Sequence, residues 1–354
     1  MNIGVLYALL SALLFGISTP LAKLLVGQIA PLMLAGLLYL GSGLGLLLWF
    51  VLRQTRGEPR AARLTRPDLP WLAGAVLAGG VAGPALLMLG LSVTSASTAS
   101  LLLNLEGVFT AALAWFVFKE NFDRRIFLGM CCIVVAGSLL SWQPALSSTS
   151  TTAQSGLAWG TLAIIAACFC WAIDNNLTRK ISASDAVQIA GIKGLVAGSI
   201  NLTIALATGA AFPQVNNIVA AGLVGFGGYG LSLVMFVIAL RHLGSARTGA
   251  YFSVAPFVGA VIAVLFLGDA PNMLFWIAGA LMAMGIWLHL SEHHMHPHQH
   301  EAMQHAHGHA HDAHHQHQHD FDWDGKEPHV HEHPHDALSH EHEHFPDIHH
   351  RHGN

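Results

Sequence analysis

The chain has 354 residues, of which 53% are hydrophobic and 10% are charged, and its mean hydropathy is +0.51. Its formal net charge of −4 combines two unlike parts: residues 1–290 carry 14 basic and 8 acidic side chains, whereas residues 291–354 carry 2 and 12. This composition indicates a membrane protein with a polar tail, and because no basic surface interleaved with aromatic residues is present, we expect no nucleic-acid partner.

Ten mostly apolar segments follow one another along residues 1–290, and a helix needs about 20 such residues to cross a bilayer. Backbone polar groups in lipid must be bonded within the protein, and these segments lack the alternation of membrane β-strands. We therefore predict an all-α integral membrane fold with ten transmembrane helices. The predicted spans are residues 3–26, 30–52, 71–91, 96–117, 126–142, 157–178, 186–207, 218–240, 246–267 and 272–290.

The loop charges predict the orientation of these spans. With a cytoplasmic N-terminus, all twelve basic residues of the loops face the cytoplasm and none faces outward, as the positive-inside rule requires. Ten spans then return the chain to its starting side, so we expect a multi-pass protein of the inner or plasma membrane with both termini cytoplasmic. The twelve residues are Arg53, Arg56, Arg60, Arg63, Arg66, Lys119, Arg124, Arg125, Arg179, Lys180, Arg241 and Arg247.

The two halves of the apolar region resemble each other. FGISTPLAK (15–23) matches WAIDNNLTR (171–179), and LNLEGVFTAALAWFVFKE (103–120) matches FSVAPFVGAVIAVLFLGD (252–269) at an offset of 149. Because one copy contains an odd number of spans, the second copy inserts upside down relative to the first. Inverted repeats of this kind are typical of secondary transporters, whose substrate site lies near the middle of the membrane.

The repeat divides the chain into four parts. We predict a first five-helix repeat at 1–142, an extracytoplasmic linker at 143–156, a second five-helix repeat at 157–290 and a His-rich tail at 291–354.

These features resemble a known family. The five-plus-five helices, the ALRHLGSA-type junction before each fourth helix, and the Lys119-Glu120 and Gly268-Asp269 pairs that follow it are similar to EamA-type members of the drug/metabolite transporter superfamily. The resemblance covers residues 3–290 and implies a substrate-specific carrier, often an exporter of amino acids, metabolites or drugs. One departure is Glu106-Gly107, where the second copy has Ala255-Pro256.

Few ionisable residues lie within the predicted spans. A charge at the centre of a membrane helix costs about 2.5–3.5 kcal/mol, so each should have a partner or a water-filled cavity. Asp174 and Lys193 lie at similar depths from the cytoplasmic side and are predicted partners. They form either a structural ion pair between the sixth and seventh helices or a contact to the gate or substrate.

Glu106 lies near the middle of the fourth span. A carboxyl group there can exchange a bound proton for a bound cation, as an antiporter requires, or it can remain protonated and bonded to a neighbour such as Asn104, Thr98 or Thr110. Nearby amides complete the candidate transport and coupling residues. These are Glu106, Asp174, Lys193, Asn104, Asn175 and Asn176.

The tail contains 23 of the 25 histidines, all between His293 and His352. Its low complexity predicts disorder, and its cytoplasmic imidazoles suit divalent transition metals such as Zn, Ni, Co or Cu. The tail could deliver metal to the pore, sense metal and gate the carrier, or only buffer metal. The candidate ligands are His305, His307, His309, His311, His314, His315, His317, His319, His329, His331, His333 and His335.

The sequence thus predicts a secondary transporter that exports a small metabolite, amino acid or drug-like solute and carries a regulatory metal-binding tail. The alternatives are a divalent transition-metal (Ni, Co or Zn) efflux carrier and a non-transporting membrane protein for metal storage or sensing. We expect no enzyme and no required cofactor, because GxSxG and HExxH patterns are absent from the spans. The expected partners are the lipid bilayer, a small-molecule or ion substrate and transition-metal ions; a homodimer is compatible with the sequence.

Overall fold

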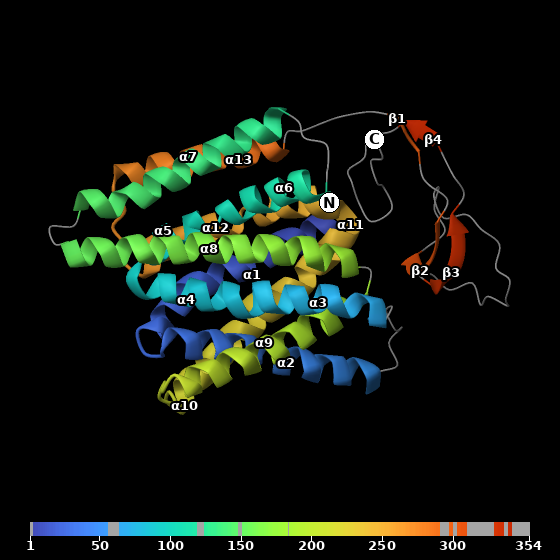
Figure 1. Cartoon of the computed structure of the whole chain (residues 1–354), viewed down its shortest axis with the longest axis horizontal. Helices are drawn as coiled ribbons and strands as arrows, with labels where there is room; N and C mark the ends of the chain where they lie inside the picture. Colours follow the sequence, from blue (N-terminus) through green and yellow to red (C-terminus); the bar gives the residue numbers. More distant parts are fainter. Residues whose placement is uncertain are drawn as a thin grey trace.

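The described residues between 3 and 290 form a bundle of helices, which Figure 1 shows with the longest axis of the molecule horizontal. The computed structural model describes residues 3–55, 64–118, 124–147, 151–182 and 184–290, together with 297–299, 303–309, 329–335 and 339–341 of the tail.

The helices follow the chain as two similar sets. The first repeat consists of α1 (Ile3–Val26), α2 (Pro31–Thr55), η1 (Arg66–Asp68), α3 (Leu69–Ala75), η2 (Val76–Ala82), α4 (Gly83–Val93), α5 (Ala96–Leu102), α6 (Leu105–Phe118) and α7 (Arg124–Ser147). The second consists of α8 (Thr151–Ile181), α9 (Ala186–Ala207), α10 (Val215–Val224), η3 (Gly225–Leu231), α11 (Ser232–Phe252), α12 (Ala255–Phe266) and α13 (Met273–Leu290). Here η1 is a 3₁₀ turn, and η2 and η3 are π-helical.

The prediction of ten transmembrane helices in an all-α fold is confirmed. Eight helical segments of the described chain are long and apolar enough to cross a membrane, and two shorter apolar helices, Phe127–Ser141 and Met273–Leu288, complete the ten. Most spans begin and end within a few residues of the predicted positions. The third is the main exception, because it begins at Arg66 rather than at residue 71.

The predicted linker at 143–156 is largely helical. Residues 143–147 continue α7, and α8 already begins at Thr151. The Ser, Thr and Gln residues here end the apolar run, but they do not end the helix, because a helix can continue into water beyond the bilayer.

The first helix of each repeat packs mainly against the other repeat. α1 packs mainly against η3, α11 and α12 of the second repeat, whereas α8 packs mainly against α3, η2, α4 and α6 of the first. α2 pairs with α9 and α7 with α13, so these contacts also join the two repeats. The repeats are therefore interlocked, and the spatial groups of helices differ from the two halves of the sequence.

The close crossing of α2 and α9 depends on glycines. A Cβ atom on Gly36 would lie 2.8 Å from the backbone nitrogen of Leu202, and one on Gly194 would lie 2.6 Å from that of Gly43. A Cβ on Gly43 would in turn meet the backbone of Gly194 and Leu195. Small residues allow membrane helices this close approach, which brings their backbones into van der Waals contact.

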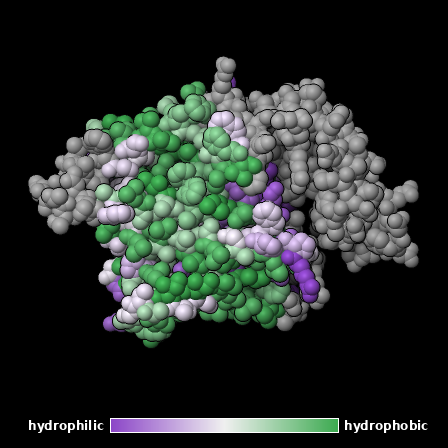
Figure 2. Space-filling view, in the orientation of Figure 1, coloured by the Kyte–Doolittle hydropathy of each residue, from purple (hydrophilic) through white to green (hydrophobic). Residues whose placement is uncertain are grey.

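The outer surface of the bundle is apolar. Phe116, Trp159, Leu223 and Phe266 are all exposed, and hydrophobic residues cover most of the face in Figure 2. Large exposed apolar patches are rare on soluble proteins, whereas lipid provides a matching environment for them.

Within the part of the tail that the structure describes there are four short strands. β1 (Pro297–Gln299) pairs with β4 (Ser339–Glu341), and β2 (Met303–His309) pairs antiparallel with β3 (His329–His335). The alternating HAHGH and HVHEHPH patterns have the two-residue period of a strand. The strands lie beyond the end of the bundle at which α1 begins (Figure 1).

We predict that Gly43→Ala destabilises the protein by about 1–3 kcal/mol, because the new methyl group must push α2 away from α9. The measurement is the thermal unfolding of the purified protein in detergent. Gly222→Ala is the control, since a Cβ there meets nothing within 4 Å. Equal stability of the two variants would contradict the close crossing.

Candidate functional site

The third and eighth spans change helical geometry at corresponding positions. The π-helical segments η2 (Val76–Ala82) and η3 (Gly225–Leu231) lie 149 positions apart, at the same offset as the repeat. Pro84 lies just after the first, and its ring would clash with the carbonyl of residue 80 in a regular helix. A wider π turn relieves such a conflict, and π turns occur often at functional sites.

The fourth and ninth spans are broken at corresponding positions as well. The first of these breaks separates α5 from α6 at Leu103 and Asn104, and the second separates α11 from α12 at Ser253 and Val254. The helix before the first break, α5, packs on α12, whereas the helix after it, α6, packs on α8. Such discontinuous helices commonly form the substrate sites of secondary transporters.

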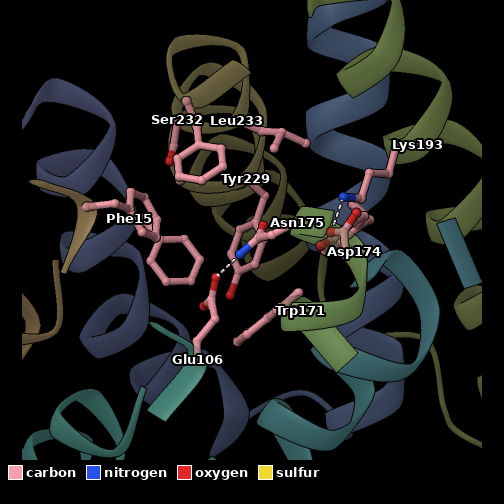
Figure 3. Close-up of a pocket in the computed structure, with 13 residues that line it drawn as sticks. Phe15, Glu106, Trp171, Asp174, Asn175, Lys193, Tyr229, Ser232 and Leu233 are labelled. Carbon is pink, nitrogen blue, oxygen red and sulfur yellow. Dashed lines mark hydrogen bonds and ion pairs between the residues drawn. The ribbon is translucent and has the colours of Figure 1, made fainter. Parts of the chain in front are cut away.

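A cavity lies between these irregular segments (Figure 3). It contains about 470 Å³ of space, part of which is open to solvent. Its lining comes from both repeats and combines aromatic rings with a few charged and polar groups. The lining residues are Phe15, Tyr39, Glu106, Trp171, Asp174, Asn175, Lys193, Gly228, Tyr229, Ser232, Leu233, Phe236 and Phe252.

Glu106 enters the cavity from the first turn of α6. Its carboxylate Oε1 accepts a hydrogen bond of 2.7 Å from Asn175 Nδ2 on α8. The N-terminus of a helix favours a negative charge, whereas burial within the membrane span opposes it. Among the described residues, no Lys or Arg forms an ion pair with Glu106. The predicted neighbours Asn104, Thr98 and Thr110 are not its partners.

Asp174 and Lys193 form an ion pair between α8 and α9, as their similar depth predicted. Lys193 Nζ donates to Asp174 Oδ2, and Thr178 Oγ1 donates to Asp174 Oδ1 at 2.9 Å. Asp174 is 4% exposed and Lys193 2% exposed, so the two charges compensate each other away from water. The absence of a side chain at Gly79 makes room for the Asp174 carboxylate.

The aromatic residues of the cavity were not predicted from the sequence. Tyr39 OH and Trp171 Nε1 both donate to the carbonyl of Gly79 in η2, at 2.8 and 2.9 Å. The ring of Phe15 lies edge-on to that of Trp171, with centroids 5.9 Å apart, and 5.8 Å from that of Tyr229. One signal was available: Phe15 and Trp171 begin the two matching repeat segments.

Four of the six predicted transport residues line the cavity, namely Glu106, Asp174, Asn175 and Lys193. The other two do not. Asn104 Nδ2 points to Met282 Sδ at 3.6 Å, and Asn176 Nδ2 donates to the carbonyls of Thr110 and Ala172 at 3.3 and 2.9 Å. These two amides therefore join helices rather than contact the cavity.

The predicted metal ligands of the tail are placed only in part. Six of them lie opposite one another in three cross-strand pairs: His305 with His333, His307 with His331, and His309 with His329. His335 pairs with Met303. The remaining five candidates, His311, His314, His315, His317 and His319, lie outside the described residues.

Comparison with known proteins identifies the family. The model of the EamA-like transporter family matches residues 2–142 and 158–291. An uncharacterized transporter of Methanothermobacter thermautotrophicus is 28% identical over 300 residues, which cover 80% of this chain and 85% of that protein. The uncharacterized transporter YyaM of Bacillus subtilis is 23% identical over 205 residues, which cover 56% of this chain and 66% of that protein.

A solved structure shares the fold. It superposes with a TM-score of 0.61 at 17% sequence identity and covers 81% of this chain and 96% of its own. At this identity the likeness concerns architecture alone.

We predict that removing one member of the buried ion pair is costly, whereas removing both is tolerated. Asp174→Asn or Lys193→Met alone leaves an uncompensated charge and should cost about 3–5 kcal/mol. The double variant should be clearly more stable than either single variant. Thermal unfolding of the four proteins as a double-mutant cycle measures the coupling. Additive effects would show that the charges do not compensate each other.

Proposed function

Because the chain belongs to the EamA-like transporter family, we propose that it is a secondary carrier that exports a small organic solute through the cavity around Glu106. The observation that carries the proposal is the cavity itself. It lies beside two π-helical segments and a helix break, and both inverted repeats contribute to its lining. A site of this kind between inverted repeats is where secondary transporters bind their substrates.

The interlocked packing suggests which parts move. We define the carboxylate lobe as α3, η2, α4, α6 and α8, and the aromatic lobe as α1, η3, α11 and α12. Each lobe is held together by the packing of α8 or α1 within it. Glu106, Asp174 and Asn175 belong to the carboxylate lobe, whereas Phe15 and Tyr229 belong to the aromatic lobe. Rocking of these lobes would open the cavity to one side of the membrane at a time.

Glu106 is the proposed coupling residue. It is the carboxylate of the cavity that has an amide rather than a cation as its partner. A proton and a substrate can therefore compete for it, which is the requirement for proton-driven antiport. Asp174 is already neutralised by Lys193. We therefore propose that the pair sets the shape and polarity of the cavity and takes no part in proton exchange.

The loop charges support the proposed orientation, with both termini in the cytoplasm of a cell whose inner or plasma membrane holds the carrier. Arg53, Arg66, Arg125 and Arg179 all belong to helix ends on the side where α1 begins. The proposal is compatible with a homodimer in which each chain keeps its own complete cavity.

The tail supports a second, regulatory function. The register of β2 and β3 sets three pairs of histidines opposite each other, and alternate positions of a strand share one face. Imidazoles at this spacing suit a divalent transition metal. We propose that metal bound here regulates the carrier; metal efflux, storage and sensing without transport are the alternatives that the experiments below separate.

We predict that Glu106→Gln abolishes proton-coupled transport without preventing membrane insertion. The purified chain is reconstituted into vesicles that contain a pH-sensitive dye, and a pH gradient is imposed. Alanine, phenylalanine, phenethylamine, benzyltrimethylammonium and benzoate are then added singly. At least one solute should accelerate proton movement with the wild-type chain and none with Glu106→Gln.

Asp68→Asn is the matched control for this experiment, because it removes a carboxylate at the exposed start of the third span. Its proton movement should equal that of the wild type. Unchanged solute-dependent proton flux in Glu106→Gln would contradict the coupling role, and a wild type that moves no solute would contradict the carrier function.

We also predict that a chain ending at Leu290 loses most of its metal binding but keeps its transport. Equilibrium dialysis with Ni²⁺, Co²⁺, Zn²⁺ and Cu²⁺ measures the bound ions, and expressing cells are tested for metal content. The regulatory proposal expects unchanged cellular metal and a transport rate that responds to metal only in the full chain. A metal content lowered by the full chain would instead establish efflux.

A further inference from the structure

The charges and rings of the cavity define the chemical class of its ligand. We propose that the cavity binds a monovalent organic cation, an amine or quaternary ammonium with an apolar body, between the Glu106 carboxylate and the aromatic rings. The inference rests on the proposed carrier function for its biological meaning, but it concerns binding and can be tested separately.

The charges of the cavity favour a single positive charge on the ligand. Two carboxylates and one ammonium group line it. Asp174 and Lys193 compensate each other, which leaves Glu106 as the net negative charge. An unpaired carboxylate inside a membrane protein is costly, so a cation that approaches Glu106 supplies the missing partner.

An anionic or zwitterionic ligand fits these charges poorly. Its carboxylate would need a cationic partner, and Lys193 is held by Asp174 at 2% exposure. It would also meet the like charge of Glu106. The Asn175 amide donates its N–H to Glu106, so its oxygen, an acceptor suited to an ammonium N–H, remains.

The rings offer the second half of the site. Tyr39 and Trp171 both use their hydrogen-bonding groups on the Gly79 carbonyl, so they present ring surface to the cavity. Tyr229 lies with its ring centroid 5.4 Å from that of Tyr39, and Phe252 lies 5.4 Å from Phe15. Aromatic faces attract cations within about 6 Å, and rings grouped in this way recognise quaternary ammonium groups.

The same chemistry argues against a bare metal ion as ligand. Transition metals select several nitrogen, oxygen or sulfur ligands at fixed geometry. Glu106 and Asn175 provide three oxygens between them, and the surrounding side chains are mainly carbon. Aromatic rings gain most from a cation that carries little water, and an alkylammonium group meets this condition better than a hydrated metal ion.

Equilibrium dialysis of the purified full-length chain with radiolabelled benzyltrimethylammonium tests the inference. We expect saturable binding of one cation per chain, displaced by excess unlabelled cation but not by benzyl alcohol or phenylacetate. Protons should compete with it, so binding should weaken as the pH falls. Glu106→Gln should weaken binding at least tenfold and Phe252→Leu several-fold, whereas Asp68→Asn, outside the cavity lining, should weaken it less than twofold.

Three results would overturn the inference: no saturable binding to a folded, monodisperse wild type; displacement by phenylacetate or benzyl alcohol at the same concentration as by the cation; or full affinity in folded Glu106→Gln. Its failure is distinguishable from that of the carrier function. If phenylalanine or benzoate drives Glu106-dependent proton flux while the cation does not bind, the carrier stands and the ligand class is wrong. If the cation binds and no solute moves, the ligand class stands and the carrier function is wrong.

Discussion

A charge in the interior of a bilayer must be compensated from within the protein, and the contact of Asp174 with Lys193 meets this requirement. The pair needs room, which the missing side chain of Gly79 provides. The carbonyl of the same glycine accepts hydrogen bonds from Tyr39 and Trp171. One residue of a π-helical segment thus links the ion pair to two rings of the cavity, so the polar and aromatic parts of the site depend on a single piece of backbone.

The inverted repeats share their backbone but not their chemistry. The two π-helical segments match in position, and Gly79 corresponds to Gly228. Gly79 faces the Asp174 carboxylate, whereas Gly228 faces the small hydroxyl side chain of Ser18. Glu106 likewise corresponds to Ala255. A repeated backbone allows two related arrangements that open to opposite sides, while the unequal side chains place both carboxylates of the cavity in the carboxylate lobe.

Sequence patterns predicted the spans, the inverted repeat and the ion pair, because each depends on features that few residues share: long apolar runs, a constant offset, and two opposite charges at similar depth. They did not predict the aromatic residues of the cavity. Phenylalanine, tyrosine and tryptophan are common in apolar spans, and the direction in which each ring points depends on helix rotation, which a π turn changes. The helical continuation through 143–147 was missed for a related reason, since hydropathy reports where the bilayer ends rather than where the helix ends.

The exchange of α1 and α8 between the repeats has a consequence for coupling. The bond from Asn175 to Glu106 lies within the carboxylate lobe, so motion between lobes preserves it. The ring contact of Phe15 with Trp171 joins the two lobes and must change when they separate. Under the proposal, a cation held at Glu106 would attract the rings of the aromatic lobe and draw the lobes together, whereas a protonated, neutral Glu106 would exert no such attraction. In the proposed carrier, the occupancy of Glu106 thus biases the same interface that has to open, which would link the bound species to the direction in which the cavity faces.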